Sequence, residues 1–224
     1  VFQQPIEDDE QLLHRFKQEL VLSRKLAHNN IIQLFDIGIH RGYRYISMEL
    51  LSGDELKAQL GKPIDLGRGI DYLIQACDGL QYAHDKGIIH RDVKPQNFFV
   101  TQENVLKVMD FGIAKQGGTE GKTVAGMIAG TPNYMSPEQI NGFSNVTPAT
   151  DIYAMGCIAY EMFTGDVPFS HAELMPLLMM HMTKPPVPPS QHNPNIPQPL
   201  EKMILKLHQV LYFNLLFFIF QTSS

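Results

Sequence analysis

Apolar side chains recur with a helical period in three parts of the chain. Between residues 66 and 87 they are spaced by four, three, four and three positions, as on one face of a helix: Leu66, Ile70, Leu73, Cys77 and Leu80. A similar stripe near the start of the chain predicts another helix: Leu12, Phe16, Leu20 and Leu26. From Asp151 to Phe163 apolar residues cover the whole circumference of a helical projection. That third pattern predicts a helix buried on all sides.

Two short runs before residue 60 have the character of strands. Residues 31–35 with the residues just after them, and residues 43–48, are β-like, and the glycine-bounded residues 38–42 predict a hairpin connection between the two runs. Residues 52–54 predict a turn, and residues 55–60 predict a short helix after it.

Three later segments have the composition of short strands or of loops. Residues 88–112 predict short strands joined by polar loops, and the glycine- and threonine-rich residues 117–130 predict a surface loop. Seven prolines between Pro185 and Pro199 predict an extended connection over the surface.

Composition limits the classes of protein that remain. A chain of 224 residues, 44% hydrophobic and 18% charged, can form one domain or two small lobes that share a cleft. The net charge of −5 gives no basic excess for nucleic acid. Cys77 and Cys157 stand far apart with no Cys-x-x-Cys spacing, which excludes a disulfide framework and a thiolate zinc site. Together with an acidic N-terminal run in place of a signal peptide, these features predict an intracellular globular protein.

The C-terminal residues 210–220 form an apolar run of eleven residues, rich in phenylalanine. A helix of that length is too short to span about 30 Å of hydrocarbon. Two interpretations stay open, a buried core segment and a non-native or membrane-touching tail.

The densest chemistry lies in His90–Asn97 and, thirteen residues after Asn97, in Asp110–Gly112. Asp92, Asn97 and Asp110 carry the oxygen donors that a hard cation such as magnesium prefers. Lys94 is a point charge suited to phosphate oxygens. Apolar residues flank these polar groups, so buried strands are expected to present them at a cleft.

These residues resemble the conserved motifs of eukaryotic-type (Hanks-type) protein serine/threonine kinases. His90–Asn97 matches the family's H-R-D-x-K-x-x-N loop, Asp110–Gly112 matches D-F-G, and Ser136–Glu138 stands where the family has Ala-Pro-Glu. The resemblance covers about residues 1–207. Within the family, the sequence resembles the bacterial members most. It implies an α+β, two-lobed protein-kinase-like fold with a small β-rich N-lobe and a mostly helical C-lobe.

The resemblance also implies a site for ATP and magnesium. Asp92 is expected to be the catalytic base, Lys94 to contact the transferred phosphate, and Asn97 and Asp110 to hold Mg²⁺. Residues assigned to nucleotide binding are Met48 as gatekeeper, Glu49 and Leu51 through hinge backbone groups, and Lys94, Gln96, Asn97 and Asp110. Residues His90 and Phe111 are expected to pack the loop against the core.

Further roles follow from the same resemblance. Thr131 is expected to line the substrate pocket and to bond Lys94 and Asp92. Glu19 matches the glutamate of the family's helix αC. Arg91 is expected to receive a phosphate on the activation segment, either from Thr119 or, as the preferred choice, from Thr123.

The sequence departs from the family at both ends. It contains no Gly-x-Gly-x-x-Gly, no strand lysine to pair with Glu19, and no arginine after Arg91 to pair with Glu138. The expectation is a kinase domain truncated at both ends and impaired as given: a partial N-lobe over residues 1–51 (αC, β4, β5 and hinge in the family's naming), a C-lobe over 52–207 and an atypical hydrophobic tail over 208–224.

The expected activity is transfer of the ATP γ-phosphate to protein Ser/Thr hydroxyls, with a protein substrate and no nucleic acid as partners. The expected location is the cytoplasm or the cytoplasmic face of a membrane, and membrane association of the full-length protein stays open. Two alternatives remain. A nucleotide-free pseudokinase-like binding module is disfavoured by intact Asp92, Asn97 and Asp110. A small-molecule phosphotransferase is disfavoured by Lys94, Thr131 and Ser136–Glu138.

Overall fold

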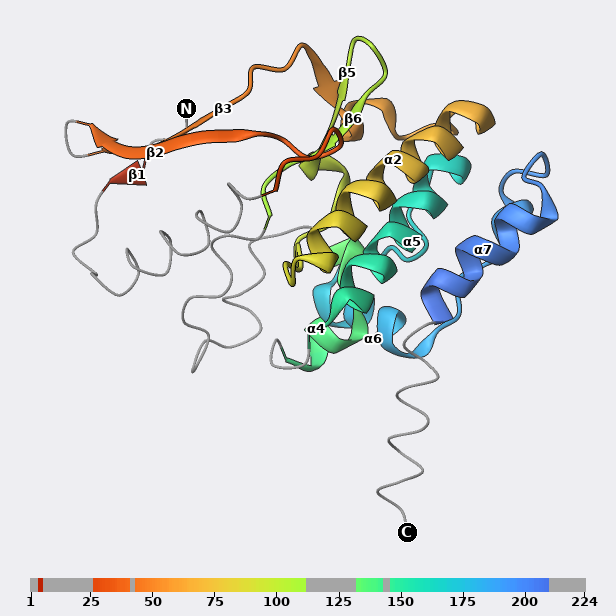
Figure 1. The fold of residues 1–224 in the computed structure, drawn as a ribbon. Helices are drawn as coiled ribbons and strands as arrows, with labels where there is room; N and C mark the ends of the chain where they lie inside the picture. Colours follow the sequence, from red (N-terminus) through yellow and green to blue (C-terminus); the bar gives the residue numbers. More distant parts are fainter. Residues whose placement is uncertain (1–3, 6–25, 41–42, 112–131, 143–145, 210–224) are drawn as a thin grey trace.

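The computed structural model describes residues 4–5, 26–40, 43–111, 132–142 and 146–209. A small sheet formed early in the chain extends to one side of a larger, mostly helical part, which carries a second small sheet (Figure 1). This arrangement agrees with the expected α+β fold class. The division of the chain at residue 51 and the separate tail after residue 207 stay predictions.

The first sheet has the antiparallel order β1-β3-β2, in which β1 is Gln4–Pro5, β2 is Leu34–His40 and β3 is Tyr43–Met48. The second predicted β-like run is therefore confirmed, whereas the first begins later than predicted, because β2 starts at Leu34 and Ile31 forms only an isolated bridge to Val108. The predicted connection over residues 38–42 is too long, because β2 pairs with β3 as far as His40 and Tyr43. A register shift between Leu34 and Asp36 marks an irregularity at the start of β2.

The second sheet has the antiparallel order β4-β5-β6, formed by β4 (Gly53–Glu55), β5 (Phe98–Thr101) and β6 (Leu106–Val108). The turn predicted over residues 52–54 is wrong, since Gly53 pairs with Thr101. Gly53 has φ 147°, and a Cβ there would lie 2.1 Å from the carbonyl oxygen of Val100, so only glycine allows this pairing. The short helix predicted next is a single 3-10 turn, η1 (Leu56–Gln59).

The long predicted helix is present as α2 (Leu66–Asp85), and the Asp65 side chain caps it by accepting the Arg68 N–H at 3.0 Å. Its predicted apolar face is partly wrong, because Ile70 and Cys77 are exposed. Seven residues of α2 are buried: Gly69, Tyr72, Leu73, Ala76, Gly79, Leu80 and Ala83. The four glycines and alanines among them are positions that the spacing of large apolar residues does not indicate.

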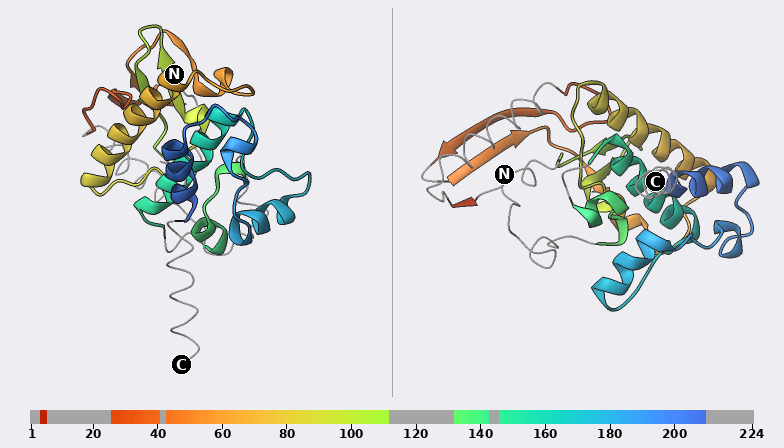
Figure 2. Two further views of the ribbon diagram at one scale, coloured as in Figure 1. Left: turned by 90° about the vertical axis from the view of Figure 1, so that its right-hand side faces the viewer. Right: turned by 90° about the horizontal axis from the view of Figure 1, so that it is seen from below.

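The helix predicted to be buried on all sides is α5 (Pro148–Thr164), which lies between α2 and α7 (Figures 1 and 2). Thr147 caps its start through the Ala149 N–H, and Gly165 ends it in the left-handed region with φ 89°. Every residue from Thr150 to Thr164 except Ile152 is buried, which confirms the prediction.

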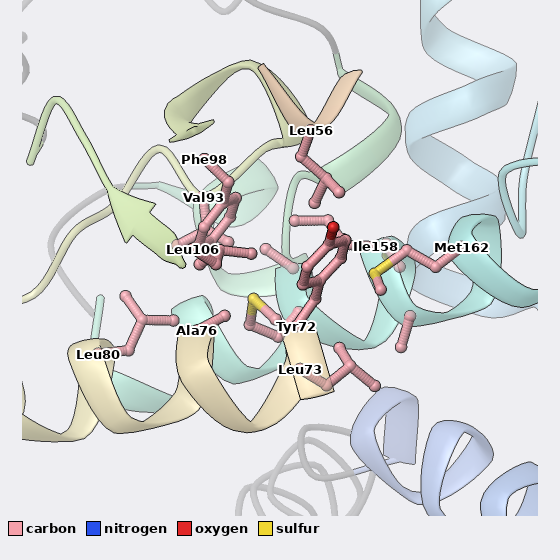
Figure 3. Packing of buried hydrophobic residues seen from close by; sticks show 14 of the residues in the cluster. Leu56, Tyr72, Leu73, Ala76, Leu80, Val93, Phe98, Leu106, Ile158 and Met162 are labelled. Carbon is pink, nitrogen blue, oxygen red and sulfur yellow. The ribbon is translucent and has the colours of Figure 1, made fainter. Parts of the chain in front are cut away.

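Figure 3 shows how the main core joins α2, α5 and the second sheet. Tyr72, Ala76 and Leu80 of α2 face Phe98 of β5 and Leu106 of β6, and Ile158 and Met162 of α5 complete the cluster. Val93, from the polar loop that the sequence singles out, also lies in this core. The loop is thus anchored by an apolar side chain between its polar ones, each such burial contributing about 1.5–3 kcal/mol.

The remaining helices are α4 (Pro137–Asn141), α6 (Leu174–Thr183) and α7 (Gln198–Gln209). The proline-rich segment is less extended than predicted, because it contains a 3-10 turn, η5 (Pro189–Gln191), and α7 begins within it. Two hydrogen bonds fix it: Ser190 N–H donates to Glu201 Oε2 at 2.7 Å, and Asn193 Nδ2 donates to the Phe163 carbonyl at 2.9 Å. Among the helices in the described ranges, none combines the length and apolar character needed to cross a membrane.

Candidate active site

The polar loop from His90 to Asn97 runs between the second sheet and the start of α5. Its backbone is held by Asp151, whose carboxylate accepts the His90 N–H at 2.8 Å and the Arg91 N–H at 2.9 Å. His84 of α2 contacts the same carboxylate at 2.7 Å. Asp151 is fully buried, so these three contacts supply the compensation that a buried carboxylate requires.

His90 and Phe111 pack the loop against the strand that precedes Asp110. The His90 ring is fully buried, contacts the Met109 carbonyl oxygen through Nε2 at 2.8 Å and lies 4.8 Å from the Phe111 ring. Its Nδ1 accepts the Asp92 N–H at 3.3 Å, which leaves Nε2 protonated and donating. These contacts agree with the expectation that His90 and Phe111 are packing residues.

Asp92, Lys94 and Asn97 form one hydrogen-bonded cluster. Lys94 Nζ lies 2.9 Å from Asp92 Oδ2, and both side chains are about one-fifth exposed. Asn97 Nδ2 donates to the Asp92 carbonyl oxygen at 2.7 Å and reaches Asp92 Oδ2 at 3.3 Å. The 3-10 turn η2 (Pro95–Asn97) brings Asn97 back toward Asp92, and Asn97 itself is buried. The carboxylate is therefore oriented by a cation and an amide while it stays accessible to solvent.

Asp110 follows β6 and lies next to this cluster. The Met109 N–H donates to the Asn97 carbonyl oxygen at 2.8 Å, which ties the residue before Asp110 to the turn that carries Asn97. Asp110 is exposed and has φ 49°, a left-handed conformation that is uncommon for a residue with a side chain. Arg91, on the other side of Asp92, has φ 66°. Strained backbone of this kind concentrates at functional sites.

The donors present fit a magnesium ion held jointly with a phosphate ligand. Asn97 uses its Nδ2 on Asp92, which leaves Oδ1 as an oxygen donor, and Asp110 is exposed on the segment that the Met109–Asn97 backbone bond joins to η2. Within the described residues no group of three His, Cys, Asp or Glu side chains could hold a metal by itself. Mg²⁺ commonly takes one or two protein ligands and completes its shell with phosphates and water.

A small apolar cluster packs residues of the first sheet and its neighbouring segments against Met109, the residue before Asp110. Ile32 and Leu34 form its buried centre, and Met48, Leu51 and Met109 pack against them. Met48 and Leu51 are two of the residues assigned to the nucleotide, and Met109 immediately precedes Asp110. The cluster therefore places apolar side chains of the expected adenine region beside the expected magnesium strand.

Glu49, between Met48 and Leu51, is fixed by its backbone and its side chain. Its N–H donates to the Gln33 carbonyl at 2.9 Å, and its Oε1 accepts the Gln33 N–H at 2.7 Å and Lys107 Nζ at 2.8 Å. The Glu49 carbonyl oxygen and the Leu51 N–H are the hinge backbone groups that the resemblance assigns to adenine. These are backbone groups of the kind that hold a planar heterocycle.

Gln96 lies inside η2, and its Oε1 is buried without a hydrogen-bond partner in the described part of the chain. Glu138 Oε1 accepts the Thr150 hydroxyl, whereas its Oε2 is buried and has no partner within the described ranges. The buried helix α5 thus supplies one contact to Glu138, a residue for which the sequence offers no later arginine.

The segment after residue 131 is attached directly to the loop. Gln139 Nε2 donates to the Arg91 carbonyl oxygen at 2.8 Å, and Ser136 and Gln139 form a capping box at the start of α4. Tyr134 donates to Glu161 Oε2, and Lys57 Nζ contacts Glu161 Oε1 at 2.8 Å. Four residues expected to act here lie outside the described residues: Glu19, Thr119, Thr123 and Thr131.

A family model of the protein kinase domain matches residues 2–211. The chain belongs to the protein kinase family. It is 41% identical over 201 residues to the serine/threonine-protein kinase Pkn1 of Myxococcus xanthus and 39% identical over 202 residues to a probable serine/threonine-protein kinase of Clostridium acetobutylicum. It is 36% identical over 200 residues to the serine/threonine-protein kinase PknB of Mycolicibacterium smegmatis.

These matches cover 86–89% of the kinase chain but only 29–32% of each relative. The chain therefore spans about a third of the length of these relatives. The resemblance inferred from the motifs, including its bacterial character, is confirmed by the family and by the relatives.

Several residues of this kinase site escape the motif. Asp151 and His84 lie 61 and 6 positions from His90, and nothing in the local sequence indicates that they meet. Lys107 looks like a solvated strand residue, yet its side chain is only 15% exposed in its pair with Glu49. Only a signal that links distant positions could have shown these contacts.

Proposed function

We propose that the kinase site transfers the γ-phosphate of ATP to serine or threonine hydroxyls of protein substrates. The observation that carries this proposal is the cluster in which Lys94 and Asn97 orient an accessible Asp92 carboxylate beside the strand leading to Asp110. Names of the relatives support the serine/threonine class. A lysine two residues after the catalytic aspartate fits that class as well.

Asp92 is proposed as the base and orienting group. The substrate hydroxyl oxygen forms a bond to the γ-phosphorus while the bond from that phosphorus to the β–γ bridging oxygen breaks. The hydroxyl proton passes to Asp92, and ADP leaves with the electron pair of the broken bond. Lys94, 2.9 Å from the same carboxylate, places its positive charge where the transferred phosphate develops negative charge.

Asn97 Oδ1 and the Asp110 carboxylate are proposed to hold Mg²⁺. When bound, the ion neutralises charge on the β- and γ-phosphates. The hydrogen bond from Asn97 Nδ2 to the Asp92 carbonyl fixes the amide so that its oxygen is directed away from Asp92. The backbone bond between Met109 and Asn97 keeps the two proposed ligands on adjoining segments.

At the other end of the nucleotide, the Glu49 carbonyl and the Leu51 N–H are proposed to bind adenine, with Met48 as gatekeeper. The apolar cluster around Ile32 supports this placement, since Met48, Leu51 and Met109 supply the apolar surface that a purine requires. Gln96 is proposed to contact the nucleotide from η2, and Thr131 to line the pocket for the substrate chain.

The test compares phosphorylation of serine, threonine and tyrosine peptides by the kinase chain joined to the glycine-rich strands and C-terminal helices of a kinase that has them. Asp92→Asn should lower turnover at least about 100-fold and change the apparent affinity for ATP far less. Asp78→Asn is the matched control, because Asp78 is an exposed residue of α2, and this variant should retain full turnover. An Asp92→Asn variant above a tenth of the unsubstituted rate contradicts the assignment, and phosphorylation of an aminoglycoside in place of peptides favours the small-molecule alternative.

We further propose that these 224 residues alone bind Mg·ATP weakly and transfer phosphate negligibly. No Gly-x-Gly-x-x-Gly occurs in the sequence, so the phosphates are proposed to stay open to water, which weakens each electrostatic contact. Micromolar Mg·ATP affinity together with peptide phosphorylation by the unextended chain contradicts this point.

Regulation is proposed to act through Arg91 and a phosphorylated Thr123 or Thr119. Arg91 lies next to Asp92 and its carbonyl oxygen is held to α4 by Gln139, so a phosphate on one of these threonines is proposed to bind the Arg91 side chain directly beside the catalytic aspartate. Mass spectrometry of the active, ATP-treated extended kinase should find phosphate on one of the two threonines. The substrate is proposed to be a protein, and the location is proposed to be the cytoplasm or the cytoplasmic face of a membrane.

A further inference from the structure

One ion pair connects the adenine side of the site with the strand that ends at Asp110. Lys107 of β6 and Glu49, just after β3, lie 58 positions apart and meet with 2.8 Å between Nζ and Oε1. Their side chains are only 15% and 23% exposed. A pair shielded to this extent is screened less by water and salt than an exposed one.

The same Glu49 oxygen also accepts the Gln33 N–H at 2.7 Å. Gln33 follows Ile32, whose N–H donates to the Val108 carbonyl oxygen at 2.9 Å. The Glu49 carboxylate thus joins three segments, namely the residues before β2, the residues after β3, and β6. These contacts make Glu49 a junction between the first sheet and the second.

From Lys107 the structure continues directly to the transfer chemistry. Two residues later the Met109 N–H binds the Asn97 carbonyl, and the Met109 carbonyl contacts His90 Nε2 at 2.8 Å. β6 is therefore fixed to the catalytic loop by backbone and side-chain bonds. The Lys107–Glu49 pair is the charged side-chain contact that extends this fixed unit to the adenine side.

We propose that Lys107 is a positioning residue that, through Glu49, sets the spacing between the adenine-binding backbone and the magnesium strand. The inference rests on the proposed function, because it needs a nucleotide that spans both. Lys107 should therefore affect the affinity of ligands that contact both the adenine-binding backbone and the magnesium strand. Adenosine, which lacks the phosphates, contacts one end only.

The experiment measures the affinities of Mg·ATP and adenosine for the 224-residue chain by ¹⁵N NMR titration into the millimolar range. Lys107→Met removes the charge and keeps the length of the side chain. It should weaken Mg·ATP binding about three- to tenfold and change adenosine binding less than about twofold. Lys107→Arg, which retains the charge, should restore Mg·ATP binding.

Glu49→Gln provides a second variant that keeps an acceptor for the Gln33 N–H and removes the charge. It should reproduce the Lys107→Met effect, and the double variant should be no weaker than either single one, because both remove one interaction. If Lys107→Met folds poorly by circular dichroism, Glu49→Gln carries the same comparison.

Lys57→Met is the matched control, since Lys57 forms a 2.8 Å ion pair of the same kind with the buried Glu161 and takes no part in the Glu49–Lys107 pair. It should leave the ratio of the two affinities unchanged even if it lowers stability. A Lys107→Met variant that weakens both ligands equally, or neither, overturns the inference while the proposed function stands. Failure of the unsubstituted chain to bind either ligand overturns the inference, whereas peptide phosphorylation by the extended chain decides the proposed function separately.

Discussion

Asp151 accepts the backbone N–H of Arg91 at 2.9 Å, although 60 residues separate the two in the chain. Arg91 has φ 66° there, a conformation that an L-residue adopts only when its surroundings hold it. The other Asp151 oxygen accepts the His90 N–H and contacts His84. The buried helix α5 therefore fixes the backbone directly before Asp92.

Asp151→Ala should destabilise the kinase chain strongly. The change leaves two loop N–H groups and the His84 ring without their acceptor, in a site that excludes water, so we expect a loss of about 2–5 kcal/mol in the free energy of unfolding. Urea denaturation measures it. Asp85→Ala is the control, because Asp85 is exposed and its carboxylate accepts a hydrogen bond from the exposed Gln81 near the end of α2. A loss for Asp151→Ala as small as that of the control contradicts the anchoring role.

Asn97→Ala tests the contact between η2 and Asp92. The Asn97 side chain is buried and donates to the Asp92 carbonyl at 2.7 Å, so its removal leaves that oxygen without its donor. The expected cost is about 1–3 kcal/mol of unfolding free energy, read from the midpoint of a urea titration. Asn195, exposed beyond η5, is the control position, and Asn195→Ala should change stability by less than about 0.5 kcal/mol. Equal midpoints for the two variants count against the buried bond.

Two glycines of α2 should respond to alanine in opposite directions. A Cβ at Gly79 would lie 2.8 Å from the backbone carbonyl oxygen of Asn30, whereas one at Gly67 would meet nothing nearer than an Asp65 side-chain oxygen at 3.5 Å. Gly79→Ala should therefore cost about 1–3 kcal/mol, because a backbone segment must move. Gly67→Ala should add about 0.5–1 kcal/mol through the lower entropy of the unfolded chain. Thermal unfolding of both variants decides, and a stabilised Gly79→Ala would falsify the close approach.

Periodic patterns in the sequence predicted the helices α2 and α5 because their residues repeat on a helical scale. The buried face of α2 was only partly predictable, since Gly69 and Gly79 are buried to let Phe163 and the Asn30 backbone approach. Spacing of large apolar residues cannot indicate a position that is buried because it is small. The same limit explains why exposed Ile70 was assigned to the buried face.

The contacts of the site are likewise only partly predictable from the local sequence. Asp92, Lys94 and Asn97 lie within six residues, so a local motif predicts their cluster, and the structure brings them together. The contacts of Asp151 and Lys107 depend on how α5 and β6 pack against distant segments. At Gly53 the local sequence is typical of a turn, yet the residue pairs with β5 as part of a strand. Here a distant contact overrides the local preference.

Two histidines are buried against α5, namely His181 of α6 and His208 of α7. His181 is fully buried, its Nδ1 lies 2.8 Å from the Tyr153 hydroxyl, and its Nε2 has no partner in the described part of the chain. Burial, with a smaller effect of His208, lowers the pKa of His181 from 6.5 to about 4. Burial also lowers the pKa of His208, partly opposed by its bond to the Ile204 carbonyl.

The free energy of unfolding should fall as the pH falls, because the unfolded chain binds a proton more readily than the folded one. Between pH 6.5 and about pH 4 the unfolded chain carries a proton on His181 and the folded chain does not, so the stabilisation is complete above pH 6.5 and declines as the pH falls. From about pH 7.5 to about pH 5 the loss due to His181 alone should approach 2 kcal/mol. Hydrogen bonds from Ser190 hold the pKa of Glu201 below its ordinary 4.5, so this carboxylate takes up its proton at a lower pH than the unfolded-chain histidine.

Urea denaturation at several pH values above about pH 5 gives the slope of stability against pH for each variant. His181→Leu should lower stability near neutral pH, because the Tyr153 hydroxyl loses a partner, and should also flatten the slope by about one proton. His171→Leu is the control, as His171 is exposed and bonds only to Glu173, and its slope should match that of the unsubstituted chain. A His181→Leu variant with an unchanged slope would show that this histidine takes up its proton in the folded kinase as readily as in the unfolded one.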